Sequence, residues 1–235
     1  MKKVIFGLIA IVFLSFSSNA QISITHDDAK KIAVEHNNYL ANLIKTNPTS
    51  QKSINNYFDN LKFDNVSNEE KTKYFSNYSY DSNLSLLKKY INNSKVFEII
   101  NNCNLIIENE KINLSDINIQ LDKQIEYAKS TLSKTDLEVC LVYIEVLKKS
   151  GEFWLEKERG GSGVGNSFLN NNNIQGKKET PKSHKVLAAD AMGASGALII
   201  GALASPWAGI GAPAVFFGIV GASAAWSSGC AAIGL

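Results

Sequence analysis

The sequence is poor in the residues that usually carry recognition and catalytic chemistry. It contains 3 cysteines, 3 histidines, 4 prolines and a single arginine, Arg159. Because bidentate capture of phosphate or carboxylate groups favours arginine, that mode of recognition is poorly supplied. The formal net charge is +2, and it falls to zero once Lys2 and Lys3 are set aside with the leader described below. A neutral chain lacks the clustered basic face that binds nucleic acid, so we expect no nucleic-acid partner.

The chain also lacks the motifs of common enzyme and metal sites. It has no phosphate-binding loop, no Gly-x-Ser-x-Gly elbow and no Ser/His/Asp or Cys/His pattern that spacing supports. The run His26, Asp27 and Asp28 is a weak metal candidate, because no second His or Cys cluster lies at helical spacing from it. Such residues at a helix start more often cap the helix or face solvent. We therefore predict a protein that is not an enzyme and uses no cofactor or metal.

The three cysteines, Cys103, Cys140 and Cys230, fit no zinc or redox spacing, and their number is odd. Cys103 and Cys140 form a possible disulfide across two helices if their Cα atoms come within about 7 Å. The alternative is two buried free thiols that act as small hydrophobic residues. Cys230 lies in an apolar C-terminal segment, where we expect it to pack.

Residues 1–20 have the organisation of a cleavable secretory signal peptide. Two lysines form a positive start, residues 4–16 form an apolar run, and Ser18 and Ala20 are small residues before the cut. The run is shorter than the roughly 20 residues of a membrane span, and an uncleaved N-terminal anchor is the alternative. No cysteine follows the cut, which argues against a lipoprotein. The mature chain would begin at Gln21 and reach the periplasm, the envelope or the medium, where disulfides can form.

Residues 21–157 form a polar segment with almost no β-strand alternation. Apolar residues recur instead at helical spacing, beginning with an expected helix at residues 27–45. The two clearest helices come last, at residues 116–132 and 135–149. Their apolar seams contain Ile117, Leu121, Ile125, Ala128 and Leu132, followed by Leu137, Cys140, Leu141, Ile144 and Leu147. One-sided stripes joined by short connections predict an all-α body of five to seven mostly antiparallel helices.

Residues 158–185 have the composition of a linker. The run Gly-Gly-Ser-Gly-Val-Gly that begins at Gly160 predicts a flexible segment, and the polar, turn-rich residues after it mark a domain boundary. Just before the linker, Phe153 and Trp154 either pack on the body or act as an interfacial anchor. Four lysines at the end of the linker either touch anionic headgroups or lie in solvent. The sequence leaves both choices open.

Residues 186–235 form a Gly/Ala-rich segment with no charged residue after Asp190. Prolines divide it into candidate helices at residues 186–205 and 214–233, each about 30 Å long, which matches a hydrocarbon core. Small residues recur every four positions, so that two backbones can approach closely, as membrane helices do. The predicted packing residues are Ala189, Gly193, Ala197, Gly201, Ala214, Gly218 and Ala222, with a second row at Gly221, Ala225 and Gly229.

Two tryptophans in this segment, Trp207 and Trp226, are predicted to lie at a membrane interface. Asp190 is predicted near a helix end, where its charge reaches water. Three interpretations of the segment remain open: a membrane-associating hairpin, a soluble hairpin buried in the body, and a secreted membrane-active segment that oligomerises. Glycine in a soluble helix costs about 1 kcal/mol relative to alanine, so close packing has to offset that cost.

The hairpin segment resembles a known group of sequences. Its stretches AMGASGALIIGALA and GIVGASAAWSSG are similar to the glycine-zipper segments of small pore-forming bacteriocins and of glycine-zipper envelope proteins. The whole layout also resembles a loose set of uncharacterised exported bacterial proteins that carry a Phe-Trp pair before a Gly-Gly-x-Gly stretch, here Phe153, Trp154 and residues 160–163. The resemblance implies an exported protein whose tail meets a membrane.

We therefore predict an exported bacterial protein whose hairpin at residues 186–235 associates with a membrane or with copies of itself. One alternative is a secreted bacteriocin-like or toxin-like factor that permeabilises membranes. Another is a soluble helical binding protein in which the hairpin is ordinary core.

Overall fold

The computed structural model describes residues 23–63, 66–69, 71, 75, 79–171, 183–203 and 213–233. In these ranges the regular elements are helices and no strand occurs, so the predicted all-α class is confirmed. The expected signal peptide at residues 1–20 lies outside the described residues, as do Trp207 and much of the polar stretch at residues 172–182.

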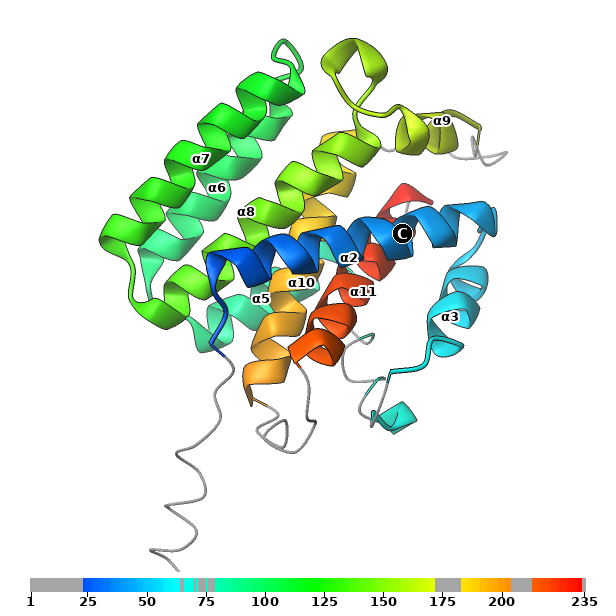
Figure 1. Cartoon of the computed structure of the whole chain (residues 1–235), viewed down its shortest axis with the longest axis horizontal. Coiled ribbons are helices and arrows are strands. Elements are labelled where there is room, and N and C mark those ends of the chain that lie inside the picture. The colour runs from blue at the N-terminus through cyan, green and yellow to red at the C-terminus, as the bar shows by residue number, and fades with distance from the viewer. Residues whose placement is uncertain are drawn as a thin grey trace, which may run out of the picture.

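The helices follow one another along the chain with short connections. In chain order they are α2 (His26–Lys45), α3 (Gln51–Asp59), α5 (Tyr80–Tyr90), α6 (Ser94–Glu108), α7 (Leu114–Thr131), α8 (Lys134–Trp154), the 3-10 turn η1 (Lys157–Arg159), α9 (Val164–Asn171), α10 (Ser183–Leu203) and α11 (Pro213–Ala232). Figure 1 shows α10 and α11 side by side in the middle, with α2 crossing them, α8 beside them, and the α6–α7 pair beyond α8.

Side-chain caps determine where several of these helices begin. The hydroxyl of Thr25 accepts a hydrogen bond from the backbone N–H of Asp28, whose carboxylate accepts one from the N–H of Thr25 in return. Asn113 and Ser133 cap α7 and α8, each accepting from the N–H three residues further on. The caps place α2, α7 and α8 within a few residues of their predicted starts, and α8 continues past its expected end by more than one turn.

The hairpin α10–α11 forms the centre of the molecule. α10 packs on α11, and the pair is covered by α2 and α8, with α5 and α3 on further sides. Every residue is buried from 186 to 199, apart from the half-buried Ala188, and from 217 to 230. In this structure the hairpin is therefore buried in the helical body. Among the residues that the structure describes, no helix combines the length and the apolar content that a bilayer crossing requires.

The glycine-rich stretch predicted to be a flexible linker is folded over the part that the structure describes. Gly160 and Gly163 adopt φ angles of 87° and 73°, a region that favours glycine. A Cβ added to Gly161 would strike the backbone carbonyl oxygen of Leu155. The glycines therefore make a tight turn between α8 and α9, because only glycine fits both the backbone angles and the close approach.

The adjacent aromatic residues at the end of α8 pack into the body, which is one of the two interpretations of the sequence. Phe153 is 7% exposed and Trp154 is 0% exposed. Gly165 of α9 lies so close to Trp154 that a side chain at this position would collide with the indole ring. The turn and α9 therefore close the end of the core over Trp154.

Candidate functional site

The two helices of the hairpin approach closely at one predicted position. Gly193 of α10 faces α11, where a Cβ added to it would lie 2.7 Å from the Cβ of Ser227 and 3.2 Å from the carbonyl oxygen of Ser223. Ala189 and Ala197, one turn away on either side, are also buried. The small residues of α10 thus allow the close backbone contact that their spacing predicts.

The glycines of α11 face other helices instead. A Cβ on Gly221 would lie 2.9 Å from the backbone nitrogen of His36 and 3.1 Å from the carbonyl oxygen of Ile32, both in α2. Gly218 lies against the hydroxyl of Tyr39, with 3.3 Å between that oxygen and the added Cβ. The assignment of Gly218 to the contact within the hairpin is therefore corrected. Because α11 is apolar on all sides, its sequence periodicity does not say which helix lies on which face.

The other predicted packing residues are only partly described. Ala222 is fully buried within α11. Gly201 lies within α10 and Ala214 lies within α11, but their surroundings fall outside what the structure describes. These two positions therefore remain predictions.

Trp226, predicted at a membrane interface, is 4% exposed and lies inside the molecule. Its Nε1 donates a hydrogen bond of 3.0 Å to the Oδ1 of Asn55 in α3. Its ring packs edge to face on Phe75, with 5.8 Å between the ring centroids. In the structure Trp226 thus holds α11 against α3, because its indole N–H finds a protein partner there.

Asp190 shows the largest departure from the sequence prediction, since the residue expected to reach water is 0% exposed. Its Oδ2 accepts hydrogen bonds from the Oγ of Ser150 and, at 3.0 Å, from the Nε1 of Trp154, both in α8. Its Oδ1 lies 3.0 Å from the Nε2 of His36 in α2, an ion-pair contact without hydrogen-bond geometry. One carboxylate therefore joins α10 to both α8 and α2.

Burial of this carboxylate requires partners, because an unpaired charge in a protein interior is strongly destabilising. A signal for the site is present in the sequence. Asp190 is the one charged residue after Lys185, and His36 falls on the apolar face of α2 together with Ile32, Leu40 and Leu43. An isolated acid in an uncharged helix and an isolated histidine on an apolar stripe are each expected to find a polar partner when both helices are buried.

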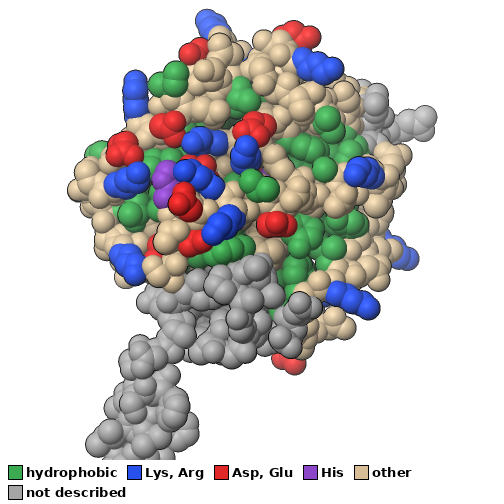
Figure 2. Space-filling view, in the orientation of Figure 1, with side chains coloured by type: hydrophobic (Ala, Val, Ile, Leu, Met, Phe, Trp, Pro, Cys, Tyr) green, Lys and Arg blue, Asp and Glu red, His purple; other side chains and the backbone are tan. Residues whose placement is uncertain are grey.

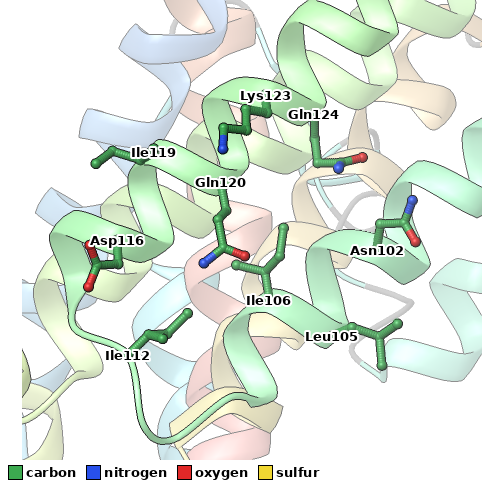
Figure 3. Close-up of a pocket in the computed structure, with 9 residues that line it drawn as sticks. All are labelled: Asn102, Leu105, Ile106, Ile112, Asp116, Ile119, Gln120, Lys123 and Gln124. Atoms are coloured by element: carbon green, nitrogen blue, oxygen red, sulfur yellow. The ribbon is translucent and has the colours of Figure 1, made fainter.

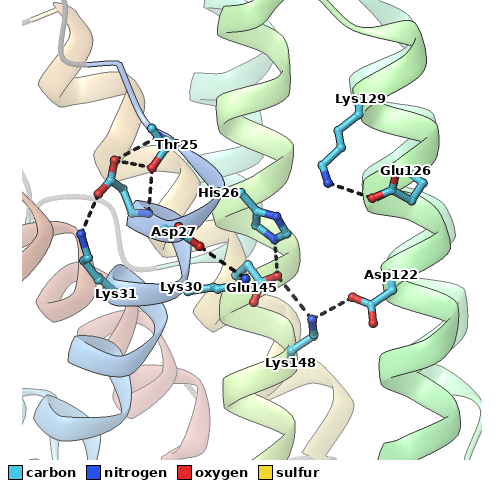
Figure 4. Close-up of polar contacts among 11 residues, drawn as sticks. Thr25, His26, Asp27, Lys30, Lys31, Asp122, Glu126, Lys129, Glu145 and Lys148 are labelled. Atoms are coloured by element: carbon cyan, nitrogen blue, oxygen red, sulfur yellow. Dashed lines mark hydrogen bonds and ion pairs between the residues drawn. The ribbon is translucent and has the colours of Figure 1, made fainter.

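A second histidine–carboxylate contact ties the start of α2 to α8. The Nε2 of His26 lies 2.7 Å from the Oε1 of Glu145, which also pairs with Lys148 at 3.3 Å (Figure 4). Lys148 reaches Asp122 of α7 at 2.8 Å. Burial opposes the charged form of Lys148, but the hydrogen bond to Asp122 and the charge of Glu145 outweigh it, so the pKa of Lys148 is raised. This chain of contacts connects α2, α8 and α7.

The weak metal candidate at the start of α2 does not converge on one centre. His26 turns towards Glu145, Asp28 caps the helix, and Asp27 lies 3.5 Å from the ammonium of Lys30 (Figure 4). Within the described ranges, no group of three or more His, Cys, Asp or Glu side chains is arranged to hold a metal ion. Figure 2 shows lysines and carboxylates interspersed on the same face of the molecule, without a patch of one sign.

Cys103 in α6 and Cys140 in α8 are buried free thiols in the structure. Burial raises the pKa of both, and the nearby charge of Asp136 adds to the effect at Cys140, whose pKa reaches about 12. The structure thus contains the free-thiol arrangement and not the possible disulfide. Cys230 is a buried free thiol as well, in the core of α11.

We expect the folded protein to resist thiol alkylation at neutral pH, because the thiolate is the reactive form and burial disfavours it. Mass spectrometry after iodoacetamide treatment should show no adduct on the native chain and adducts on all 3 cysteines in denaturant without reductant. A single adduct in denaturant would instead establish a bond between Cys103 and Cys140.

A shallow groove of about 600 Å³ lies on the surface between α6 and α7 (Figure 3). Its lining residues are Asn102, Leu105, Ile106, Ile112, Asp116, Ile119, Gln120, Lys123 and Gln124. Leu105 and Ile119 are 57% and 53% exposed despite their large apolar side chains. The groove is therefore lined by both apolar and polar side chains. The sequence patterns did not predict a site on these two helices.

Two features thus carry the functional interpretation: the apolar hairpin in the core, and the polar cluster of Asp190, His36, Ser150 and Trp154 that fixes it. The function of both features has to be inferred from their chemistry. No family model matches the chain, and neither curated proteins nor solved structures show a significant match to it.

Proposed function

We propose that the protein is exported and that its hairpin α10–α11 associates with a membrane after being stored inside the helical body. One observation carries the proposal: the hairpin helices are apolar around their circumference and fill the centre of the molecule. A helix that is apolar on all sides suits a protein core or a membrane, and few other places. The chain from residue 191 to residue 235 has no charged side chain, so it is compatible with both.

Export is proposed from the composition of residues 1–20. Ile24 is 3% exposed, and the hydroxyl of Ser23 donates a hydrogen bond of 3.3 Å to Glu138 of α8. Both residues follow the predicted cleavage position, so removal of the leader would leave these contacts in place.

The same glycines that receive α2 also suit association between hairpins. Gly218 and Gly221 now lie against Tyr39 and the backbone of α2. In lipid, small residues at this spacing let helices pack closely on each other. Self-association of released hairpins would therefore compete with their return to α2, which supports a membrane-bound form made of several copies.

The test is membrane binding by the mature chain, residues 21–235. Protein mixed with vesicles of phosphatidylethanolamine and phosphatidylglycerol is expected to float with them in a density gradient at some pH between about 7 and about 4, the range in which carboxylates and histidines titrate. Added protease should then leave a fragment that contains residues 186–233. Release of an entrapped dye would show that binding permeabilises the bilayer, as a bacteriocin-like factor would. A monomer that never floats contradicts the proposal.

A second candidate is a soluble binding protein in which the hairpin is permanent core. The specific hydrogen bonds that fix the hairpin favour it, since Asp190 and Trp226 both find protein partners. The exposed Leu105 and Ile119 would then be the surface that binds a partner. This candidate predicts a monomer that ignores vesicles over the same pH range.

A further inference from the structure

The charge in the hairpin is concentrated at a single buried residue. Between residues 186 and 235, the sequence contains one Asp and no Glu, Lys, Arg or His. That residue, Asp190, is 0% exposed and contacts the two helices that cover most of the hairpin, α2 and α8. The protonation state of Asp190 therefore sets the charge of the whole segment.

The groups that face the Asp190 carboxylate are suited to its ionised form. From α8, Ser150 and Trp154 each donate a hydrogen bond to Oδ2. From α2, the Nε2 of His36 lies 3.0 Å from Oδ1. From α11, Gly221 lies against the backbone nitrogen of His36 and brings no ionisable group. An ionised carboxylate accepts from both Ser150 and Trp154, whereas a protonated carboxyl carries a hydrogen of its own.

Other buried carboxylates belong to separate contacts on α8. Glu145 pairs with His26 and Lys148. Glu138, whose pKa is raised by burial, accepts from Ser23. Its position on α8 places it about 18 Å along the helix axis from Ser150. Neither glutamate contacts the Asp190 cluster. A fall in pH therefore changes the charge of the hairpin segment through protonation of Asp190.

We propose that protonation of Asp190 releases the hairpin from α2 and α8 and so converts the stored form into the membrane-bound form, an inference that rests on the proposed function. One proton has two effects. It removes the charge that Ser150, Trp154 and His36 hold in place, and it leaves residues 186–235 without a charged side chain, so that lipid no longer excludes them on that account.

The direction of the pH effect follows from the contact between His36 and Asp190. A proton on His36 alone places a positive charge beside the ionised carboxylate and strengthens the contact. Release therefore requires the carboxylate to take up the proton. Membrane binding is therefore expected to be greater at about pH 4 than at about pH 7.

The first test replaces Asp190 by asparagine, which removes the charge with little change in size. At about pH 7, the fraction of Asp190→Asn that floats with phosphatidylethanolamine and phosphatidylglycerol vesicles is expected to be at least about tenfold that of the unmodified chain, approaching the fraction of the unmodified chain that floats at about pH 4. Asp81→Asn, the same change at an exposed position of α5, is the matched control and should leave the floating fraction unaltered. Equal floating fractions for Asp190→Asn and the unmodified chain at about pH 7 would overturn the proposal.

A second variant keeps Asp190 and stays informative if Asp190→Asn does not fold. A Cβ on Gly196 would lie 3.2 Å from the Cβ of Asn83 in α5, near the separation of about 3.5–4.5 Å that a disulfide requires. The double variant Asn83→Cys/Gly196→Cys should therefore bind α10 to α5 when oxidised. We expect the oxidised protein not to float with vesicles at about pH 4 and the reduced protein to float as the unmodified chain does.

The outcomes separate this inference from the proposed function. If the unmodified chain neither floats with vesicles nor releases dye at any pH, the proposed function fails. If it binds equally at about pH 7 and about pH 4, membrane association stands and the proton switch fails. If the oxidised double variant floats with vesicles as the reduced one does, the hairpin does not need to leave the body, and the switch fails as well.

Discussion

Replacing His36 by alanine is expected to lower the free energy of unfolding by about 3 kcal/mol or more, because it removes the polar side chain that faces Oδ1 of the buried Asp190 carboxylate. Ser150 and Trp154 would still donate to Oδ2, but nothing would face Oδ1. The cost also includes the space left by the imidazole ring, since His36 is 0% exposed. Urea denaturation at neutral pH, followed by far-UV circular dichroism, measures the change.

The matched control is His26→Ala, which removes the other histidine of α2 that contacts a carboxylate. His26 is 28% exposed, and its partner Glu145 keeps Lys148. We therefore expect a cost well below that of His36→Ala. In the background of Asp190→Asn, His36→Ala should become much less costly, because the charge it compensates is gone. Equal costs for the two histidine variants would mean that the buried pair does not hold α2 to the hairpin.

The second large effect is expected at Gly221. An alanine there would place its Cβ 2.9 Å from the backbone nitrogen of His36 and 3.1 Å from the carbonyl oxygen of Ile32. Backbone atoms of a packed helix cannot turn aside as a side chain can, so α2 and α11 must move apart. We expect a loss of about 1–3 kcal/mol from this overpacking, set against a gain of about 1 kcal/mol from the better helix propensity of alanine.

Gly218→Ala provides the control one turn earlier on the same helix. Its added Cβ would meet the hydroxyl of Tyr39 at 3.3 Å and the ring of Phe63 at 3.5 Å, contacts that side chains can relieve. We therefore expect Gly218→Ala to be neutral or stabilising while Gly221→Ala is destabilising, each judged by the midpoint of thermal unfolding. If the two variants shift the midpoint of thermal unfolding in the same direction and by the same amount, α2 does not approach α11 more closely at Gly221 than at Gly218.

The sequence predicts the helices better than it predicts their partners. The apolar seams from Ile117 to Leu132 and from Leu137 to Leu147 are local signals, and α7 and α8 form around them. The two hairpin helices are also recognisable, since prolines and an uncharged composition set their limits. The sequence does not show which helices pack around them, because a helix that is apolar on all sides has no single face that must be buried.

The sequence contains a signal for Asp190 and for His36 separately, but it does not show that the two residues meet. Asp190 and His36 lie far apart in the chain, and each has a plausible local explanation, a solvated helix end for one and an ordinary core histidine for the other. Only the packing of α10 against α2 brings them to 3.0 Å. Likewise, the Gly160–Gly161 turn has the composition of a spacer, and the contact with Leu155 that makes it compact depends on where α8 ends.

The contact between α2 and α11 also has a consequence for how the chain acquires its structure. During synthesis, α2 emerges early, but the helix that covers its Ile32 and His36 side is made much later. Pairings between such distant segments slow folding, because a long loop must close before they form. A polypeptide that cannot complete its core until α11 has been made therefore remains incompletely folded until the end of its synthesis.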